Sequence, residues 1–394
     1  MADLELVYRQ TLEQCRPTSL VRSAVTPDLP RNVVALGKCA GPLLDGVRYA
    51  LPVQQAFAAI PRGYPSPTTS AVIVRGGHPA MDDDSFRAGQ MLLQFIESCD
   101  EVLFLVSGGG SACVEVPLAP WFTPADLMEV NDRLLDGGLP ITDMNAVRAH
   151  LSAIKGGRLA ARVPGRTVTL VYSDVSKGDH ASVASGPTVP DPTTTARAIE
   201  ILQQLGGLER IVSILRQEDF PDTVKKLEHA SSSVVADNST LVKAAAAVAA
   251  ESGFKVIAAD EQLESDVETI AQHLVDRAAA LEPGQMLIAG GEPTVARRGA
   301  GKGGRCSELA VRFALASRGA TVPLQALFAS SDGVDGNSGA AGVILDIPVA
   351  INLSEAASAL GRSDSFPLAA RLGRAIIIPP TGNNLRDLYL VARP

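Results

Sequence analysis

Short apolar runs alternate with amphipathic segments along most of the chain. Residues 102–106 are five consecutive apolar residues, and further strand-like runs occur at 167–172 and 286–289. Such runs are too short to span a membrane and suit strands of a sheet that is covered on both faces. Between them, apolar positions repeat every three to four residues, for example over 141–155 and 240–251, which predicts helices. The alternation of strands and helices predicts an α/β fold.

The length of the chain predicts two domains. At 394 residues it exceeds the usual size of a single hydrophobic core. Residues 196–233 have an amphipathic helical pattern, and a strand-like segment follows at 234–236. We therefore place the boundary there, with an N-terminal domain of residues 1–233 and a C-terminal domain of residues 234–394. Aromatic residues are only 4% of the chain, so we expect Ala, Val, Leu and Ile to form both cores.

The charge and the cysteine content exclude several classes of protein. The formal net charge is −8, without a cluster of Lys and Arg, so a nucleic-acid partner is not expected. No segment has the length of a membrane span, and the N-terminal segment predicts an amphipathic helix rather than a signal peptide. We expect a cytoplasmic protein without a membrane partner. The five cysteines lack metal-site spacing and are odd in number, which favours reduced, mostly buried thiols.

A glycine-rich loop follows the most apolar predicted strand. Its members are Ser107, Gly108, Gly109, Gly110 and Ser111. Three consecutive glycines allow successive backbone N–H groups to point at one ligand, and phosphate is the natural ligand for such a loop. The alternative is a tight strand-to-helix turn that binds no ligand.

Lys38 and His78 follow two other predicted strands. Lys38 comes after Gly37 at the start of a helix, where its charge is unfavourable unless an anion is bound. This position also lies at the carboxyl end of a strand, the edge at which open sheets bind ligands. His78 lies in a loop and is either a ligand or a hydrogen-bonding loop residue.

The helix predicted over 141–155 has a polar stripe. Asn145, Arg148 and Lys155 fall on this stripe. Two cations on one helix face suit a phosphate or a carboxylate, particularly where glycines end the helix. A solvated helix face is the alternative.

Carboxylates follow two further predicted strands. Asp174 and Asp179 lie in a turn-rich segment after 167–172, and Asp332 follows the run at 324–330. Carboxylates on such loops suit Mg²⁺, which binds through a few of them together with substrate phosphates. Taken singly, each aspartate is equally typical of a turn.

A second glycine-rich loop lies in the C-terminal half. Glu292 follows Gly290 and Gly291 at the end of an apolar strand, and we expect a hairpin after it. The loop then carries Lys302 and Arg305 into a helix, which makes it a second candidate for anion binding.

The standard nucleotide-binding motifs are absent or incomplete. Neither Gly-Lys pair has the glycine spacing and the Ser or Thr of a P-loop. The dinucleotide fingerprint requires a small third residue where Cys113 stands, which weakens the case for a nicotinamide cofactor. The remaining glycine loops, cations and strand-end aspartates are typical of phosphoryl transfer, which needs positioning, charge neutralisation and a metal.

Several blocks of sequence together resemble one family. They are SGGGSA at Ser107, NAVRAHLSAIKGGRLA at Asn145, SDV and VASGPTVPDPTT from Ser173, GGEPTV and GKGGR from Gly290, SDGVDGNSGAAG, and PTGNNLRDLYL. In this order and over nearly the whole chain, they resemble the glycerate 2-kinase family with a MOFRL C-terminal domain. The resemblance implies an N-terminal Rossmann-like α/β/α sandwich, a smaller C-terminal α/β domain, and an active site in the cleft between them.

The resemblance also implies ATP-dependent phosphorylation of the 2-hydroxyl of D-glycerate with Mg²⁺. The expected partners are a small hydroxy acid and a nucleotide, and homodimerisation is left open. Lys38 and Arg305 match cations that are proposed to act in the active site of that family. Together with the residue patterns, the expected roles are catalysis by Lys38, Arg305 and Asp174; nucleotide binding by Ser107, Gly108, Gly109, Gly110, Ser111 and Lys155; substrate binding by His78, Asn145, Arg148 and Glu292; and metal binding by Asp174, Asp179 and Asp332.

The chain departs from the family pattern in these loops. Lys177 and Gly178 replace a glycine and an aspartate, Cys306 and Ser307 replace two amides, and Gly339 replaces an acid. These changes leave open an acceptor other than glycerate. The alternatives are a kinase for a related hydroxy acid or sugar acid, an NAD(P)-dependent hydroxypyruvate reductase, and a non-catalytic sensor.

Overall fold

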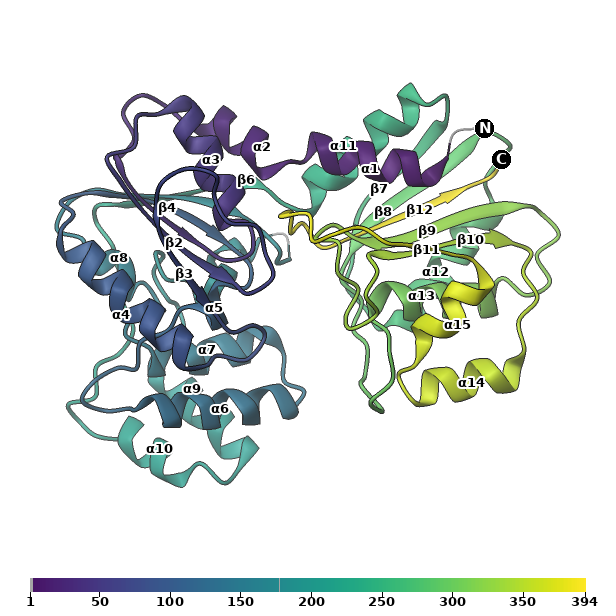
Figure 1. Cartoon of the computed structure of the whole chain (residues 1–394). Coiled ribbons are helices and arrows are strands. Elements are labelled where there is room, and N and C mark those ends of the chain that lie inside the picture. Colours follow the sequence, from purple (N-terminus) through teal and green to yellow (C-terminus); the bar gives the residue numbers. More distant parts are fainter. Residues whose placement is uncertain (1–2, 177) are drawn as a thin grey trace. The chain divides into compact units, whose positions relative to one another are not determined.

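The chain folds into two compact units. The computed structural model describes residues 3–176 and 178–394, with side chains at all of these except residues 258–261. One unit is Pro17–Val235, and the other is Ala236–Pro394 together with the N-terminal segment up to Arg16 (Figure 1). The break near residue 235 lies close to the predicted boundary. The predicted boundaries assign the N-terminal segment to the first domain. In the structure this segment belongs to the second unit.

The unit Pro17–Val235 is built on a sheet with the strand order β3-β2-β1-β4-β5-β6. Its strands are β1 (Asn32–Leu36), β2 (Gln55–Pro61), β3 (Val72–Gly76), β4 (Val102–Ser107), β5 (Thr167–Tyr172) and β6 (Ala230–Ala236). The pairs β3–β2, β2–β1, β1–β4 and β4–β5 are parallel. This is the strand order of a Rossmann sheet, whose direction of winding reverses between β1 and β4.

Helices cover both faces of this sheet. One face packs against α3 (Ala40–Ala50), which in turn packs against α2 (Pro17–Ala24). The other face packs against α4 (Asp83–Glu97), α5 (Gly110–Cys113) and α8 (Arg158–Ala161) around an apolar cluster rich in Val, Leu, Ile and Ala. The predicted Rossmann-like α/β/α sandwich is therefore confirmed.

A helical layer with its own apolar core extends this unit (Figure 1). It consists of α6 (Pro124–Asp136), α7 (Ile141–Leu151), α9 (Thr195–Leu205) and α10 (Glu209–Leu215), and the short 3₁₀ segment η1 (His180–Ser185) precedes α9. Two predictions are corrected here. The helix predicted over 141–155 ends at Leu151, and the pattern at 196–233 contains two helices followed by strand β6 rather than helix throughout.

The second unit contains a mixed sheet with the order β11-β10-β9-β12-β8-β7. Its strands are β7 (Lys255–Leu263), β8 (Gln285–Gly291), β9 (Leu324–Ser330), β10 (Gly342–Ile347), β11 (Arg374–Ile376) and β12 (Asp387–Ala392). Only β7 and β8 pair in parallel among these described strands, and the other neighbouring pairs are antiparallel. The hairpin predicted after Glu292 is not formed, since irregular chain leads from β8 to the next helix.

Helices also cover both faces of the second sheet (Figure 1). On one side α12 (Val267–Ala279), α13 (Arg305–Ala316), α14 (Leu353–Gly361) and α15 (Ser365–Leu372) share an apolar cluster with alternate strand residues. On the other side lie α1 (Leu4–Gln14) and α11 (Asn238–Glu251). The helix predicted over 240–251 is present but begins two residues earlier, at Asn238, and Asp237 caps it by accepting a hydrogen bond from Thr240 N–H at 3.0 Å.

Helix α1 is an integral part of the second unit. It buries one apolar face, which includes Leu4 and Val7, and it packs against α11 and β9. The hydroxyl of Tyr8 donates a hydrogen bond to Ser330 O at 2.7 Å, at the end of β9. The first helix of the sequence therefore supports the sheet at the far end of the chain.

The cysteines are as the composition predicts. The five cysteines are all buried free thiols. In the part of the chain that the structure describes, no helix combines the length and the apolar character that a membrane span requires.

Prediction on α1. Leu4→Ala should lower the free energy of unfolding of the second unit by about 2–5 kcal/mol, because Leu4 is fully buried and truncation leaves a cavity. Urea unfolding checks this. The matched control is Leu6→Ala on the same helix, where the side chain is 49% exposed and the change should be within about 0.5 kcal/mol. Equal effects of both variants would contradict the packing of α1 described above.

Candidate functional site

A candidate site in the first unit lies where the order of the Rossmann sheet reverses. Strands β1 and β4 are parallel neighbours, so their carboxyl ends meet at one edge of the sheet. The backbone N–H of Lys38, after β1, donates to Gly108 O, after β4, at 2.9 Å. In open α/β sheets this reversal point is the position at which ligands bind.

Ser107 fastens these two loops together. Its hydroxyl donates to Leu36 O at 3.0 Å and accepts from Cys39 N–H at 3.1 Å. The side chain is fully buried, and its hydrogen-bonding capacity is committed to the β1 loop. Ser107 therefore supports the glycine loop, whereas the sequence had suggested that it contacts phosphate.

Two glycines make this close approach feasible. Gly37 has φ +103°, and a Cβ there would lie 2.4 Å from Ser107 O. Gly109 has φ +83°, and a Cβ there would lie 3.0 Å from Cγ of Lys38 and 3.3 Å from Cδ2 of His78. Lys38, His78 and the glycine loop, which are far apart in sequence, are thus brought together. The ammonium of Lys38 also lies 5.4 Å from the ring centroid of Tyr64, a cation–π arrangement.

A chain of hydrogen bonds extends from the other end of the glycine loop. The hydroxyls of Ser111 and Ser185 are 2.9 Å apart, and Ser185 donates to Oδ1 of Asn145 at 2.8 Å. Ser185 and its neighbour Ala184 have φ of +60° and +53°, a left-handed conformation that costs energy in non-glycine residues. Such strain is concentrated at functional sites, so Ser185 joins Ser111 and Asn145 as a candidate that the sequence did not reveal.

Asp174 and Asp179 lie in the segment that follows β5. Tyr172, the last residue of β5, pairs with Ser107 of β4, so Asp174 leaves the sheet at the same edge as the glycine loop. Asp179 accepts a hydrogen bond from the hydroxyl of Ser182 at 2.9 Å. Both side chains are partly exposed, which suits residues that bind a ligand.

Lys155 is placed differently from the prediction. Its ammonium forms an ion pair with Glu115, and both side chains are at most 2% exposed. Glu115 also accepts from the hydroxyl of Ser152 at 2.5 Å. Because helix α7 ends at Leu151, Lys155 does not continue its polar stripe, and the buried pair instead fastens the chain after α5 to the chain after α7.

The other two members of the predicted stripe are only partly accessible. Arg148 donates from Nη2 to Oδ1 of Asn131 at 2.8 Å, and its Nε is buried without a hydrogen bond among the described residues. Burial lowers the pKa of Arg148, and the nearby Glu115 acts in the opposite direction. Asn145 therefore lies beside the glycine loop through Ser185, while Arg148 faces the interior of the helical layer.

A second candidate site is a charged cluster in the second unit. Arg305, the first residue of α13, donates from Nε to Oδ2 of Asp387 at 3.2 Å and from Nη2 to Oδ1 at 3.4 Å. Its Nη1 forms an ion pair with Glu292. Burial by itself lowers the pKa of Arg305, but the charges of Asp387 and Glu292 outweigh it and raise the pKa.

Arg386 adds a second cation to this cluster. Its Nε lies 3.1 Å from Oε2 of Glu292, and its Nη1 pairs with Glu264. Arg386 is mostly buried and has φ +66°. The sequence did not single out Glu264, Arg386 or Asp387, although the last two lie within the block PTGNNLRDLYL that carries part of the family resemblance.

Asp332 and Asp335 follow β9 beside this cluster. Asp332 accepts from the hydroxyl of Ser330 at 2.8 Å and from Val334 N–H at 2.9 Å. Asp335 accepts from the N–H groups of Cys306 and Ser307 at 2.9 Å each, so it caps helix α13. Asp335 therefore fixes the helix that presents Arg305.

The carboxylates are compatible with a Mg²⁺ site only if few of its ligands come from the protein. No group of three or more His, Cys, Asp or Glu side chains in the described parts of the chain is arranged to hold a metal ion. Mg²⁺ commonly uses one or two carboxylates and takes its other ligands from phosphates and water. Asp174 and Asp179 lie in the same segment after β5, whereas Asp332 belongs to the charged cluster of the second unit.

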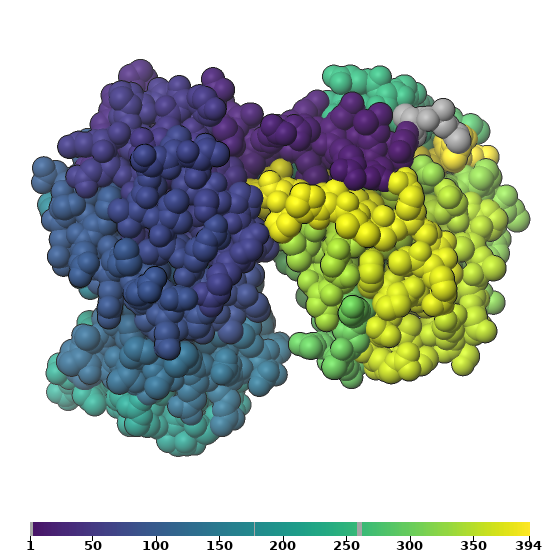
Figure 2. Space-filling model, in the orientation of Figure 1, coloured from purple at the N-terminus to yellow at the C-terminus, as the bar shows by residue number. Residues whose placement is uncertain are grey.

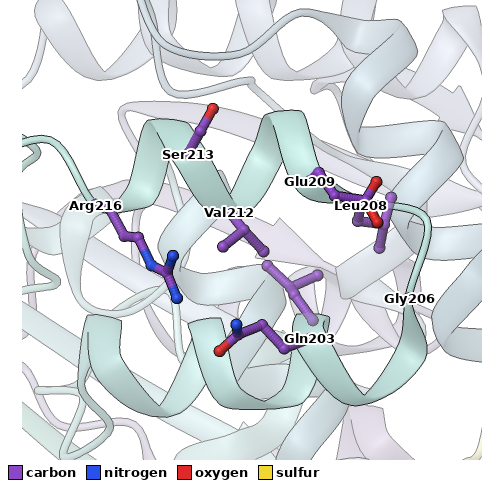
Figure 3. A pocket seen from close by; sticks show the side chains of 8 residues that line it. Gln203, Gly206, Leu208, Glu209, Val212, Ser213 and Arg216 are labelled. Atoms are coloured by element: carbon purple, nitrogen blue, oxygen red, sulfur yellow. The ribbon is translucent and has the colours of Figure 1, made fainter.

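A hollow of about 450 Å³ lies elsewhere in the first unit. It is lined by residues of α9 and α10 and their connection, among them Gln203, Glu209 and Arg216 (Figure 3). None of the predicted site residues lines it. The glycine loop and the charged cluster, rather than this hollow, contain the groups that suit phosphoryl transfer.

Comparison with known proteins identifies the family. Residues 3–217 match the model described as a domain of unknown function, DUF4147, and residues 285–387 match the MOFRL family. The glycerate 2-kinase of Pyrococcus horikoshii is 31% identical over 383 residues, which is 91% of this chain and 86% of that protein. The chain belongs to the glycerate 2-kinase family.

Other members show the range of the glycerate 2-kinase family. The crystal structure of the glycerate kinase from Thermotoga maritima has a TM-score of 0.83 with this structure at 28% identity, over 98% of both chains. A protein of Agrobacterium vitis named for hydroxypyruvate reductase activity is 32% identical over 93% of this chain and 88% of its own length. Names within the family thus cover both a kinase and a reductase.

The positions that depart from the family pattern have distinct surroundings. Cys306 and Ser307 are buried, and their backbone N–H groups donate to Asp335. Figure 2 shows one face of each unit in space-filling form. Gly178 and Gly339 are exposed and have φ of +94° and +80°, which favours glycine over an acidic residue. Lys177 lies outside the described residues.

Prediction on the buried pair. Lys155→Met should lower the free energy of unfolding by about 3–5 kcal/mol, because it leaves the buried carboxylate of Glu115 without its cation. Chemical denaturation measures this loss. The double variant Glu115→Gln/Lys155→Met removes both charges and should recover much of it. No recovery in the double variant would mean that the loss arises from packing rather than from charge.

Prediction on pH dependence. Burial raises the pKa of Asp335 to about 6 from an ordinary value of 3.8, while hydrogen bonds from Ser307 and Cys306 act in the opposite direction. Between about pH 4 and pH 6 the folded state therefore holds a proton that the unfolded state has released, so stability falls as the pH rises through this range. The slope should approach about 1.4 kcal/mol per pH unit. Denaturation at several pH values should show this contribution in the wild type and its loss in Asp335→Asn.

Proposed function

We propose that this protein is an ATP-dependent kinase that phosphorylates the 2-hydroxyl of D-glycerate to give 2-phospho-D-glycerate. The single observation that supports this most is the juxtaposition of Lys38 with Gly109 at the reversal point of the Rossmann sheet. A cation beside a glycine loop at this edge suits phosphate groups. Membership of the glycerate 2-kinase family supplies the acceptor and the donor.

The glycine loop is assigned to the nucleotide phosphates. Gly108, Gly109 and Gly110 have no side chains of their own to cover their backbone N–H groups. Ser111 adds a hydroxyl that is oriented by its hydrogen bond with Ser185. Lys38 is assigned to neutralise the charge of the transferring phosphoryl group. Such a division suits phosphoryl transfer, where catalysis consists largely of positioning and charge stabilisation.

Mg²⁺ is assigned to Asp174 with Asp179. When bound, the ion would neutralise phosphate oxygens of ATP. Asp174 leaves the sheet at the edge that carries the glycine loop, and both aspartates are partly exposed. Two carboxylates together with phosphate oxygens and water satisfy the coordination that Mg²⁺ prefers.

Arg305 is assigned to the carboxylate of the acceptor and to charge that develops on the phosphoryl group. Its planar guanidinium binds carboxylates and phosphates through paired hydrogen bonds. The 2-hydroxyl oxygen attacks the terminal phosphorus of ATP, the bond to ADP breaks, and the hydroxyl proton passes to a carboxylate. Asp174 and Asp332 are the two candidates for that base. His78 and Asn145 are assigned to substrate contacts next to the glycine loop.

A reductase is the second candidate function. It is favoured by the strand order of the sheet, which is that of dinucleotide-binding folds, and by the name of the relative from Agrobacterium vitis. Cys113, which stands where the dinucleotide fingerprint needs a small residue, is buried beneath the loop and argues against this function. Oxidation of NADH with hydroxypyruvate, in the absence of ATP, would reveal a reductase.

Prediction on the two cations. Lys38→Ala and Arg305→Ala should each lower kcat for Mg·ATP-dependent phosphorylation of D-glycerate by about 10²–10³-fold, since each removes charge stabilisation from the transition state. ADP release gives the rate, and phosphorus NMR of the product distinguishes the 2-phosphate from the 3-phosphate.

Exposed cations outside the candidate site provide the controls. Lys226→Ala and Arg362→Ala remove side chains that are 80% and 67% exposed, and both variants should retain wild-type rates. A near-normal rate for Lys38→Ala or Arg305→Ala would remove that residue from the catalytic assignment. No ADP release from the wild type with D-glycerate or any related hydroxy acid would reject the kinase function.

A further inference from the structure

Asp387 is a fully buried carboxylate in contact with Arg305, and the proposed function assigns it no role. It is the first residue of β12 and has no exposed surface. Both of its oxygens accept hydrogen bonds from the guanidinium of Arg305, from Nε at 3.2 Å and from Nη2 at 3.4 Å. A paired contact of this kind fixes the plane of a guanidinium as well as its position.

The sheet determines where this carboxylate stands. Strand β12 runs antiparallel between β8 and β9, with Asp387 opposite Gly291 at the end of β8 and Ser330 at the end of β9. Glu292 directly follows Gly291, and Asp332 lies two residues after Ser330. The start of β12 therefore lies between the ends of β8 and β9, and the backbone of both strands holds Asp387 in place.

Arg305 is accessible on another side. Its side chain is 37% exposed, whereas that of Asp387 is 0% exposed. Glu292, which binds Nη1, is itself 32% exposed. Arg305 and Glu292 therefore keep contact with solvent, whereas Asp387 does not.

We propose that Asp387 is a positioning residue, which orients the guanidinium of Arg305 toward the acceptor and the transferring phosphoryl group without touching either. This inference rests on the proposed kinase function. The oxygens of Asp387 are enclosed, so it acts through the groups that it contacts: Tyr389, whose hydroxyl donates to Oδ2 at 3.5 Å, is buried, and Arg305 is the partly exposed one. Its loss frees the guanidinium to rotate and leaves Glu292 as the remaining carboxylate contact that the structure shows for Arg305.

The neighbouring ionisable groups are consistent with this role. Burial raises the pKa of Asp387, and the charge of Arg305 acts in the opposite direction. The thiol of Cys306 and the hydroxyl of Tyr389 face the same carboxylate, and burial raises the pKa of both, so both stay neutral. Arg305 is therefore the cation that compensates the charge of Asp387 most directly.

Kinetics of Asp387→Asn test the proposal. Asparagine has the shape of aspartate but lacks its charge and one acceptor, so kcat should fall about 10²-fold, as expected when a catalytic group loses its orientation. The KM for ATP should change little, since the glycine loop is untouched. Asp346→Asn, an exposed aspartate in β10 of the same sheet, is the matched control and should keep the wild-type kcat.

A readout that does not depend on activity separates this proposal from the kinase function. In the wild type, the Nε–H group of Arg305 should give a nitrogen–proton NMR signal with slow exchange, assigned by its absence in Arg305→Lys. That signal should broaden or shift in Asp387→Asn and stay unchanged in Asp346→Asn. A wild type that phosphorylates no hydroxy acid but shows this pattern would reject the kinase function and retain the positioning role.

Chemical rescue keeps the proposal testable if Asp387→Asn does not fold, as judged by circular dichroism. In Arg305→Ala the carboxylates of Asp387 and Glu292 remain, so added guanidinium ion should restore part of kcat with saturation. It should restore none in Lys38→Ala. Wild-type kcat in folded Asp387→Asn, an unchanged Arg305 signal, or no rescue of Arg305→Ala would each overturn the positioning role.

Discussion

The parallel pairing of β1 with β4 is the constraint on which the candidate site of the first unit depends. Parallel strands end at the same edge of a sheet, so the residues that follow them meet whatever their separation in sequence. Gly37 begins the loop after β1, and Gly108 begins the loop after β4. A backbone hydrogen bond of 2.9 Å from Lys38 N–H to Gly108 O joins the two loops. Position 37 does not tolerate a side chain, because a Cβ on Gly37 would lie 2.4 Å from Ser107 O. Lys38 therefore stands beside the glycine loop as a consequence of sheet geometry.

The second unit reaches a comparable result with antiparallel strands. Its β12 begins where β8 and β9 end, which places Asp387 between the exits that lead to Glu292 and Asp332. The N-terminus of α13 then brings Arg305 to these carboxylates, and Asp335 holds that terminus through two N–H groups. A helix N-terminus disfavours a cation, and the surrounding carboxylates outweigh this effect. Helix α1, from the other end of the chain, supports the same sheet edge through Tyr8 and Ser330.

The sequence predicts the strand-and-loop part of this arrangement well. Apolar runs followed by glycine identify the exits of β1, β4 and β8, and the Rossmann-like sandwich follows from their alternation with helices. Lys155 was misplaced because the helical period was extended past Leu151, where α7 ends. Asp387 was missed for another reason: an acid after an arginine at the start of a strand has the pattern of an ordinary exposed loop. Only the pairing of β12 with strands about 60 and 100 residues away, a tertiary effect, shows that it is buried.

Two buried ion pairs in this protein illustrate how burial separates structural from functional charge. In the pair of Glu115 and Lys155 both side chains are at most 2% exposed, so the desolvation of both charges is compensated only within the pair, and no ligand can reach it. In the pair of Asp387 and Arg305 only the carboxylate is enclosed, and the side chain of Arg305 as a whole keeps 37% exposure. The buried partner holds the cation while solvent still reaches its other side. An asymmetric pair of this kind can bind an anion without first breaking, which a fully enclosed pair cannot do, and this asymmetry is the physical reason to assign Arg305 to catalysis and Lys155 to the fold.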